Sequence, residues 1–139
     1  MISINFLAVF LAALAAFILG FLFHGPISGK LWMKLANIHP TGNEKFADMI
    51  PQLIWNFVVN LVTAGGLAAL YSITSTSPLL YGASVATGIS TAILVWFGFM
   101  VTSSSIEVIW MGRSAKLWLF EAVCSLIVMA VMGAIIASM

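Results

Sequence analysis

The chain has 139 residues, of which 63% are hydrophobic and 6% are charged, and its formal net charge is +1. About a quarter of the residues in a soluble domain are charged, so this composition excludes a soluble globular domain and a disordered segment. It also excludes a nucleic-acid-binding protein, because no excess of positive charge is present to meet phosphates. The composition predicts an integral membrane protein whose main partner is the lipid bilayer.

Four stretches are long and apolar enough to cross a hydrocarbon core of ~30 Å, which takes roughly 20 helical residues. They cover residues 3–23, 51–71, 79–101 and 117–137. The sequence therefore predicts an all-α protein, a polytopic membrane protein whose single domain, residues 1–139, contains four transmembrane helices.

The connection between the first two spans contains further signals. Gly25-Pro26 ends the first helix, since proline breaks the hydrogen-bond ladder. Residues 31–38 then form an apolar and a basic face, which predicts a short amphipathic helix. This helix lies either in the membrane interface, with its lysines on anionic headgroups, or as a cap over the end of the bundle.

Capping residues and prolines mark the starts of the second and third spans. Thr41 and Glu44 have the spacing of a capping box, and Pro51 either starts the second span or kinks a longer helix. Ser77-Pro78 is a suitable N-cap and first residue for the third span.

The third span has an apolar pattern that continues from Leu79 to Met111, which is longer than a bilayer requires. The helix either projects beyond the membrane or loosens at the serines of residues 103–105. We favour a helix that continues to the interface and ends at Gly112, a residue type suited to helix C-termini.

The five basic residues all lie in the two connections that share one side of a four-span bundle: Lys30, Lys34, Lys45, Arg113 and Lys116. By the positive-inside rule these connections are cytoplasmic and both termini face outward. We therefore expect a multi-pass protein of the plasma or inner membrane.

Small residues recur at helical spacing in the first span (Ala8, Ala12, Ala16 and Gly20) and in the fourth (Ala130, Gly133 and Ala134). Such stripes let membrane helices approach closely. We expect them to support a homo-oligomer or docking to a larger membrane complex, and packing within one chain is the alternative.

Polar side chains within the spans are the candidate site residues. Asn56 and Asn60 lie one turn apart, and Asn60 and Thr91 fall near the membrane midplane. Unpaired amides are costly there, so these residues either line a cavity or form interhelical hydrogen bonds.

Ionisable residues gather at the basic side: His24, Glu107, Arg113 and Glu121. Glu121 lies inside the fourth span, which makes it a functional candidate. Alternatively, it forms an ordinary ion pair with Arg113, Lys116 or His24.

No catalytic constellation, phosphate-binding loop or metal-ligand pair is recognisable, and the lone Cys124 excludes a cysteine-based zinc site. We therefore predict a protein that is not an enzyme and has no metal or cofactor. The first hypothesis is a homo-oligomeric channel-like, transporter-like or ligand-binding protein with a cytoplasm-facing polar vestibule. Glu121, His24, Glu107 and Arg113 would line the vestibule's mouth, and the amides and Thr91 its depth. The second is a structural or accessory subunit of a larger complex.

Two segments resemble a known family. Residues 20–33, GFLFHGPISGKLWM, are similar to the signature of the small four-span proteins called domain of unknown function 1761, and residues 112–118 and 132–136 resemble its second block. The chain departs from the family pattern at Phe23-His24, Met111 and Ser125, where the family has a Trp-Tyr pair, an acidic residue and a histidine. The resemblance implies a four-span fold and a membrane location, and it brings no activity.

Overall fold

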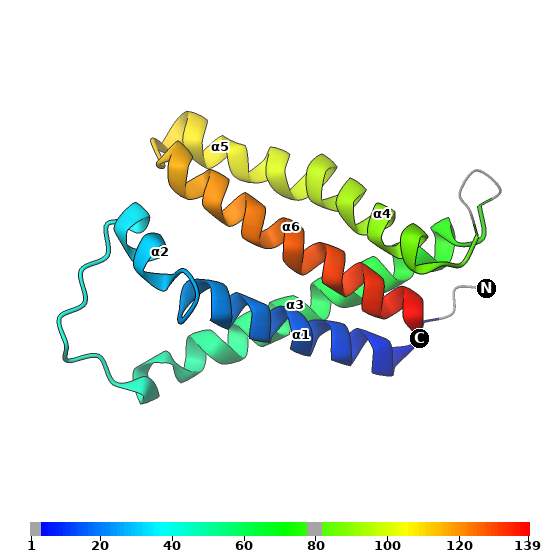
Figure 1. Cartoon of the computed structure of the whole chain (residues 1–139), viewed down its shortest axis with the longest axis horizontal. Helices are drawn as coiled ribbons and strands as arrows, with labels where there is room; N and C mark the ends of the chain where they lie inside the picture. Colours follow the sequence, from blue (N-terminus) through cyan, green and yellow to red (C-terminus); the bar gives the residue numbers. More distant parts are fainter. Residues whose placement is uncertain (1–3, 78–81) are drawn as a thin grey trace.

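The computed structural model describes residues 4–77 and 82–139, and this part of the chain contains helices and no strand. α1 spans Phe6–His24, α2 Gly29–Ala36 and α3 Phe46–Thr74. α4, Val85–Val95, continues through a π-helical segment, η1, Trp96–Val101, into α5, Thr102–Met111, and α6 spans Ala115–Ser138 (Figure 1).

The prediction of four membrane-spanning helices is confirmed. α1, α3, the rod α4–η1–α5 and α6 are each long and apolar enough to cross a membrane. The helix predicted after the first span is also present as α2. It packs against both α1 and α6, as a cap over the bundle end would.

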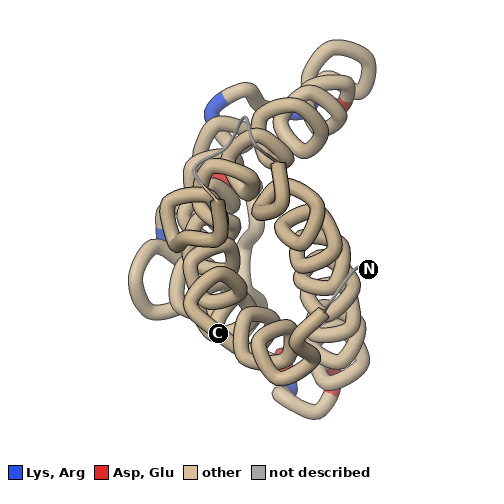
Figure 2. Tube along the Cα trace, turned by 90° about the vertical axis from the view of Figure 1, so that its right-hand side faces the viewer, with Lys and Arg blue, Asp and Glu red and all other residues tan. Residues whose placement is uncertain are grey.

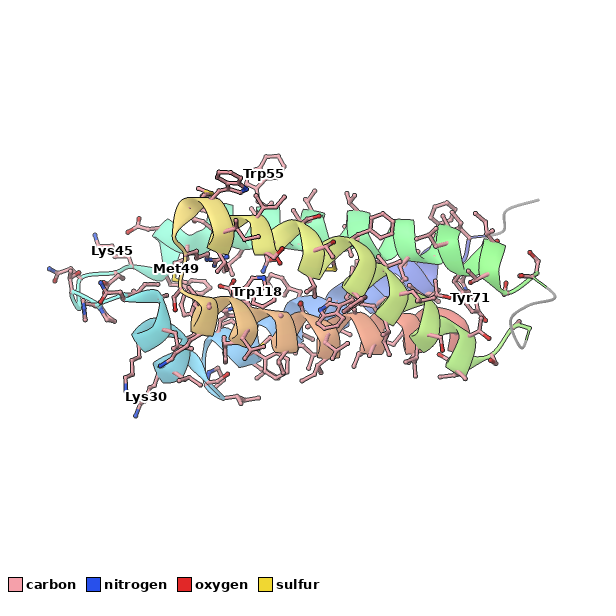
Figure 3. The ribbon with its side chains drawn as sticks, turned by 90° about the horizontal axis from the view of Figure 1, so that it is seen from above. Lys30, Lys45, Met49, Trp55, Tyr71 and Trp118 are labelled. Atoms are coloured by element: carbon pink, nitrogen blue, oxygen red, sulfur yellow. The ribbon has the colours of Figure 1, made fainter. Side chains whose placement is uncertain are left out.

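The two ends of the bundle differ in charge. One end, here called the basic end, holds the connection from α1 to α3 and the turn from α5 to α6, and all five lysines and arginines belong to it. The other, the terminal end, holds Ile4, Met139, the end of α3 and the start of α4. Figure 3 shows Lys30 and Lys45 at the basic end and Tyr71 near the terminal end. Figure 2 looks along the helices and shows how little of the trace is charged.

Local capping explains several helix ends. The side chain of Asn5 accepts hydrogen bonds from the N–H groups of Leu7 and Ala8 at 3.1 and 3.2 Å, which starts α1. Gly112 adopts φ 66° and ends α5, as predicted, because glycine takes this left-handed conformation without strain.

α3 is the longer of the two predicted alternatives. It begins at Phe46, so Pro51 lies inside its second turn and does not start it. The predicted capping box is half formed: Glu44 accepts a 2.7 Å hydrogen bond from the Thr41 N–H, but both lie before the helix. This hydrogen bond, with others from Thr41 and Gly42, holds the pKa of Glu44 below its ordinary value.

Two predicted details of the third span are corrected. α4 begins at Val85, with Ser84 as its N-cap, and not near Leu79; Pro78 of the predicted cap lies outside the described residues. Gly82 has φ 72°, which turns the chain just before the helix. The loosened turn is η1, which precedes the serines of residues 103–105 and carries Trp96, whose indole is bonded to α6.

The core is made of small residues in the terminal half of the bundle. Ala8, Ala12 and Ala16 of α1 are almost completely buried against α3 and α6. α4 crosses α6 at Gly88 and Gly133, where each glycine touches the backbone of the other. The predicted stripes are thus largely used within the chain, whereas Gly20, Ala130 and Ala134 remain partly exposed.

The helices separate towards the basic end. The Cα atoms of α3 come within 8 Å of those of α1, α4 and α6, but in the described part of the chain not of those of η1 or α5. In Figure 1 the first half of α3 diverges from the hairpin formed by α5 and α6. The bundle is therefore close-packed through its terminal half, with a hollow of about 180 Å³ beside Asn5 and Met139 at the very end, and it is open at its basic end.

The helix crossing generates a stability prediction. A Cβ atom on Gly133 would lie 2.9 Å from the Cβ of Ala92, and closer still to the backbone of Gly88, so Gly133→Ala forces α4 and α6 apart. We expect the free energy of unfolding to fall by about 1–3 kcal/mol, the usual cost of overpacking. Reversible unfolding in mixed micelles measures it.

The matched control is Gly66→Ala, since a Cβ at Gly66 of α3 meets nothing within 4 Å. We expect this variant to be as stable as the wild type or slightly more so, because glycine weakens a helix interior. Equal stability of the two variants would contradict the crossing described here.

Candidate functional site

A cavity of about 300 Å³ lies at the basic end, where α1, α2 and α3 meet. Most of its wall is apolar, and its polar side chains are His24 and Asn56. The residues that line it are Phe17, Gly20, Phe21, His24, Gly25, Trp32, Met49, Leu53 and Asn56.

The tight turn between α1 and α2 positions Trp32 in this wall. Ser28 donates a 2.6 Å hydrogen bond to the carbonyl of Phe23, and a Cβ on Gly29 would lie 2.7 Å from the carbonyl oxygen of His24. Glycine is therefore required at that position for α2 to fold back over the end of α1. As a result, the rings of His24 and Trp32 meet edge to face, with centroids 5.2 Å apart.

A second cavity of about 190 Å³ continues from the first towards the middle of the bundle, and the two share Gly20 and Asn56. Asn60, Thr63 and Ser125 add polar groups to its wall. Asn60 donates through Nδ2 to the backbone carbonyl of Asn56 at 2.9 Å and to its side-chain oxygen at 3.2 Å. The Asn56 amide nitrogen and the Asn60 carbonyl oxygen take no part in these bonds.

A third hollow of about 150 Å³ shares Met100 and Ser125 with the second. Its polar lining comes from Ser104, Trp118 and Glu121. The three cavities therefore form a series, from the meeting point of α1, α2 and α3, through the space between α3 and η1, to the hairpin of α5 and α6.

Arg113 bridges two carboxylates at the turn between α5 and α6. Its Nη1 lies 2.6 Å from an oxygen of Glu107, and its Nη2 lies 2.7 Å from an oxygen of Glu121. Of the alternatives given for Glu121, the ion pair with Arg113 is the one observed. Arg113 therefore neutralises part of the negative charge of Glu121, and the ion pair holds this side chain in the wall of the third hollow.

Two tryptophan indoles link the rod α4–η1–α5 to α6, one donating a hydrogen bond from the rod and the other from α6. The Trp96 indole of η1 donates to Ser125 of α6 at 2.9 Å, and the Trp118 indole of α6 donates to Ser104 of α5, also at 2.9 Å. With the Arg113 bridge, these bonds fix the rod α4–η1–α5 against α6 along the basic half of the bundle.

The structure distributes the predicted site residues over adjoining cavities and one ion cluster. His24, Asn56 and Asn60 share the first two cavities, whereas Glu107, Arg113 and Glu121 form the ion cluster at the helix turn. Of the two alternatives given for Thr91, the interhelical hydrogen bond is the one observed, because Thr91 of α4 is buried against the end of α3. There its hydroxyl lies 2.9 Å from that of Thr74, which makes it an interhelical link.

Sequence reasoning missed the apolar wall of the first cavity. Phe17, Phe21, Met49 and Leu53 look like any lipid-facing residues in a hydrophobic span. The signal available in the sequence was a glycine within an apolar span, Gly20, which we expected to serve helix packing. In the structure a Cβ at Gly20 meets nothing within 4 Å, so this glycine faces open space.

The comparisons with known proteins give one match. The model of the family "Protein of unknown function (DUF1761)" matches residues 7–137. The chain belongs to this family. No curated protein and no solved structure matches the chain significantly. The segment 20–33, on which the family resemblance was based, supplies five of the nine residues that line the first cavity of this DUF1761 protein.

The ion cluster predicts an order of mutational effects. Arg113→Gln leaves Glu107 and Glu121 unpaired, whereas Glu107→Gln removes one of two contacts. Because the side chains of Arg113, Glu107 and Glu121 are 33%, 46% and 29% exposed, we expect Arg113→Gln to cost about 1–2 kcal/mol, between surface and buried pairs, and Glu107→Gln to cost less. Unfolding in micelles checks this order, and a larger loss in Glu107→Gln would show that the bridge is misassigned.

Proposed function

We propose that this DUF1761 protein is a non-enzymatic membrane protein that binds a small amphipathic molecule in the cavities at its basic end. The observation that carries the proposal is the cavity of about 300 Å³ that continues into a second, more polar cavity. Ligand sites are typically concave and mostly apolar, with a few polar groups that fix orientation, and their volumes begin at ~300 Å³.

The wall chemistry supports this class of ligand. Aromatic and aliphatic side chains of α1, α2 and α3 would surround the apolar body of the molecule. The Asn56 nitrogen and the Asn60 oxygen would each gain a hydrogen bond, which at membrane depth matters because unmet polar groups are costly there.

Binding is favoured over passage through one chain. The terminal half is closed by Ala12, Ala16 and Ala64, which are almost completely buried, and by the contact of Gly88 with Gly133. A solute that enters at the basic end would therefore meet close-packed helices. The positive-inside rule supports a cytoplasmic basic end, so the entrance would face the cytoplasm.

The second candidate function is an accessory subunit or homo-oligomer that associates through small residues. Ala12 is buried inside this chain, so Ala12→Leu would disrupt the fold itself. The small residues left partly exposed, Ala130 and Ala134 of α6, support association through that helix instead.

Blocking the cavity with a side chain tests the binding function. Gly20 lines both cavities and has open space at its Cβ position, so Gly20→Leu should fill them without disturbing the packing. The measurement is photolabelling of protein in nanodiscs with an uncharged alkyl diazirine. We expect labelling of Trp32 and Leu53 to fall about tenfold relative to lipid-facing residues, since the probe loses its apolar contacts.

The matched control is Gly98→Leu in η1. Gly98 also has open space at its Cβ position but lines none of the three cavities, so labelling should stay at the wild-type value. Unchanged labelling in Gly20→Leu would remove the basis of the proposed function.

A further inference from the structure

A hollow of about 530 Å³ adjoins the first cavity on the side of α2. It is lined by residues 25–31, the turn before α2 and its first residues, and it shares Gly25 with the first cavity. Polar backbone and the Lys30 side chain therefore lie directly beside an apolar chamber. A molecule that fills both spaces needs a polar head and an apolar tail.

We propose that the ligand is an anionic amphiphile with a single acyl chain, whose head group is held by Lys30 and Lys34 while its chain enters the Phe17–Trp32 cavity. This inference rests on the proposed function, since it names the class of molecule that the same cavity binds. The head-group chemistry it requires is a carboxylate or a phosphate.

The lysines of α2 are available for such a head group. Lys30 and Lys34 lie one turn apart on α2 and are exposed, and α2 contains no acidic residue. Within residues 4–77 and 82–139, the ion pairs formed are those of Arg113, so neither lysine is neutralised by a carboxylate.

The acidic residues of the basic end do not reverse this charge. Glu107 and Glu121 are held by Arg113, and Glu44 is held by the N–H groups of Thr41 and Gly42. Asp48, in the first turn of α3, is the other carboxylate in residues 24–52, where three lysines are present. A negative head group is therefore favoured at this mouth over a positive one.

The amphipathic character of α2 explains how one short helix serves both parts of the ligand. Trp32 lies in the wall of the cavity and contacts His24, while Lys30 lines the adjoining hollow. Lysine stems lie along apolar surface and place their ammonium groups at the level of head groups. The helix thus divides the site into an apolar chamber and a basic rim.

The test compares two diazirine probes of equal chain length, a fatty acid and the corresponding fatty alcohol, in nanodiscs of zwitterionic lipid at a mildly alkaline pH. Labelling of Trp32 and Leu53 is divided by labelling of Leu94 and Phe97, which are exposed on the opposite rod and report partition into the bilayer. We expect the acid to exceed the alcohol by about tenfold, the scale that two lysines contribute near a membrane surface.

The variant Lys30→Gln/Lys34→Gln should abolish the preference for the acid without abolishing alcohol labelling. Its matched control is Lys45→Gln, a lysine of the same connection that lies outside α2, immediately before α3. The control should keep the wild-type preference, and added salt should reduce the preference because it screens exposed charges.

The remaining outcomes separate the two proposals. Equal labelling by acid and alcohol, blocked in Gly20→Leu, would overturn the anionic ligand and leave the proposed function standing. A preference for the acid that survives in Lys30→Gln/Lys34→Gln would overturn the role of α2. If neither probe labels the cavity above the lipid-facing residues, both the inference and the proposed function fail.

Discussion

The structure depends on the close approach of helices that small residues allow at the terminal end. Gly88 and Gly133 bring the backbones of α4 and α6 into contact, and Ala12 and Ala16 let α1 approach its neighbours. In a bilayer, where burial of apolar surface gives helices little reason to associate, such packing supplies much of the attraction. The terminal half is therefore closed.

The opening at the basic end follows from the loss of this packing. Towards that end larger residues such as Phe57, which contacts the ring of Phe17, and Trp96 replace alanine and glycine, and α3 has no close contact with η1 or α5 among the described residues. One wall of the resulting space is fixed by the tryptophan bonds and by Arg113, whereas α3 is held mainly by α1. The second cavity lies between this fixed wall and α3, and the first adjoins it where α1, α2 and α3 meet, so a molecule could enter beside the less tightly held helix.

The four spans, the one-sided charge and the end of α5 at Gly112 could be predicted from the sequence, because length, hydropathy and helix-ending residues are local properties. The rotation of each helix could not. The spans are apolar on every side, so the pattern does not tell a buried face from a lipid-facing one. For this reason the sequence leaves open whether Thr91 lines a cavity or forms an interhelical hydrogen bond, such as the one it makes with Thr74, and it leaves Glu121 three candidate partners.

The most direct test of this account is the spacing of the helices in a bilayer. One pair of spin labels, at Ile54→Cys and Ile106→Cys, measures the distance between α3 and α5 in nanodiscs. A second pair, at Ile73→Cys and Val85→Cys, measures the distance between α3 and α4, which pack together. All four positions are exposed, and Cys124 is replaced by alanine. The account predicts a clearly longer distance for the first pair, beyond the 8–10 Å axial separation of packed helices. Equal distances for the two pairs would show α3 packed along its full length, which would contradict the open basic end and its cavity.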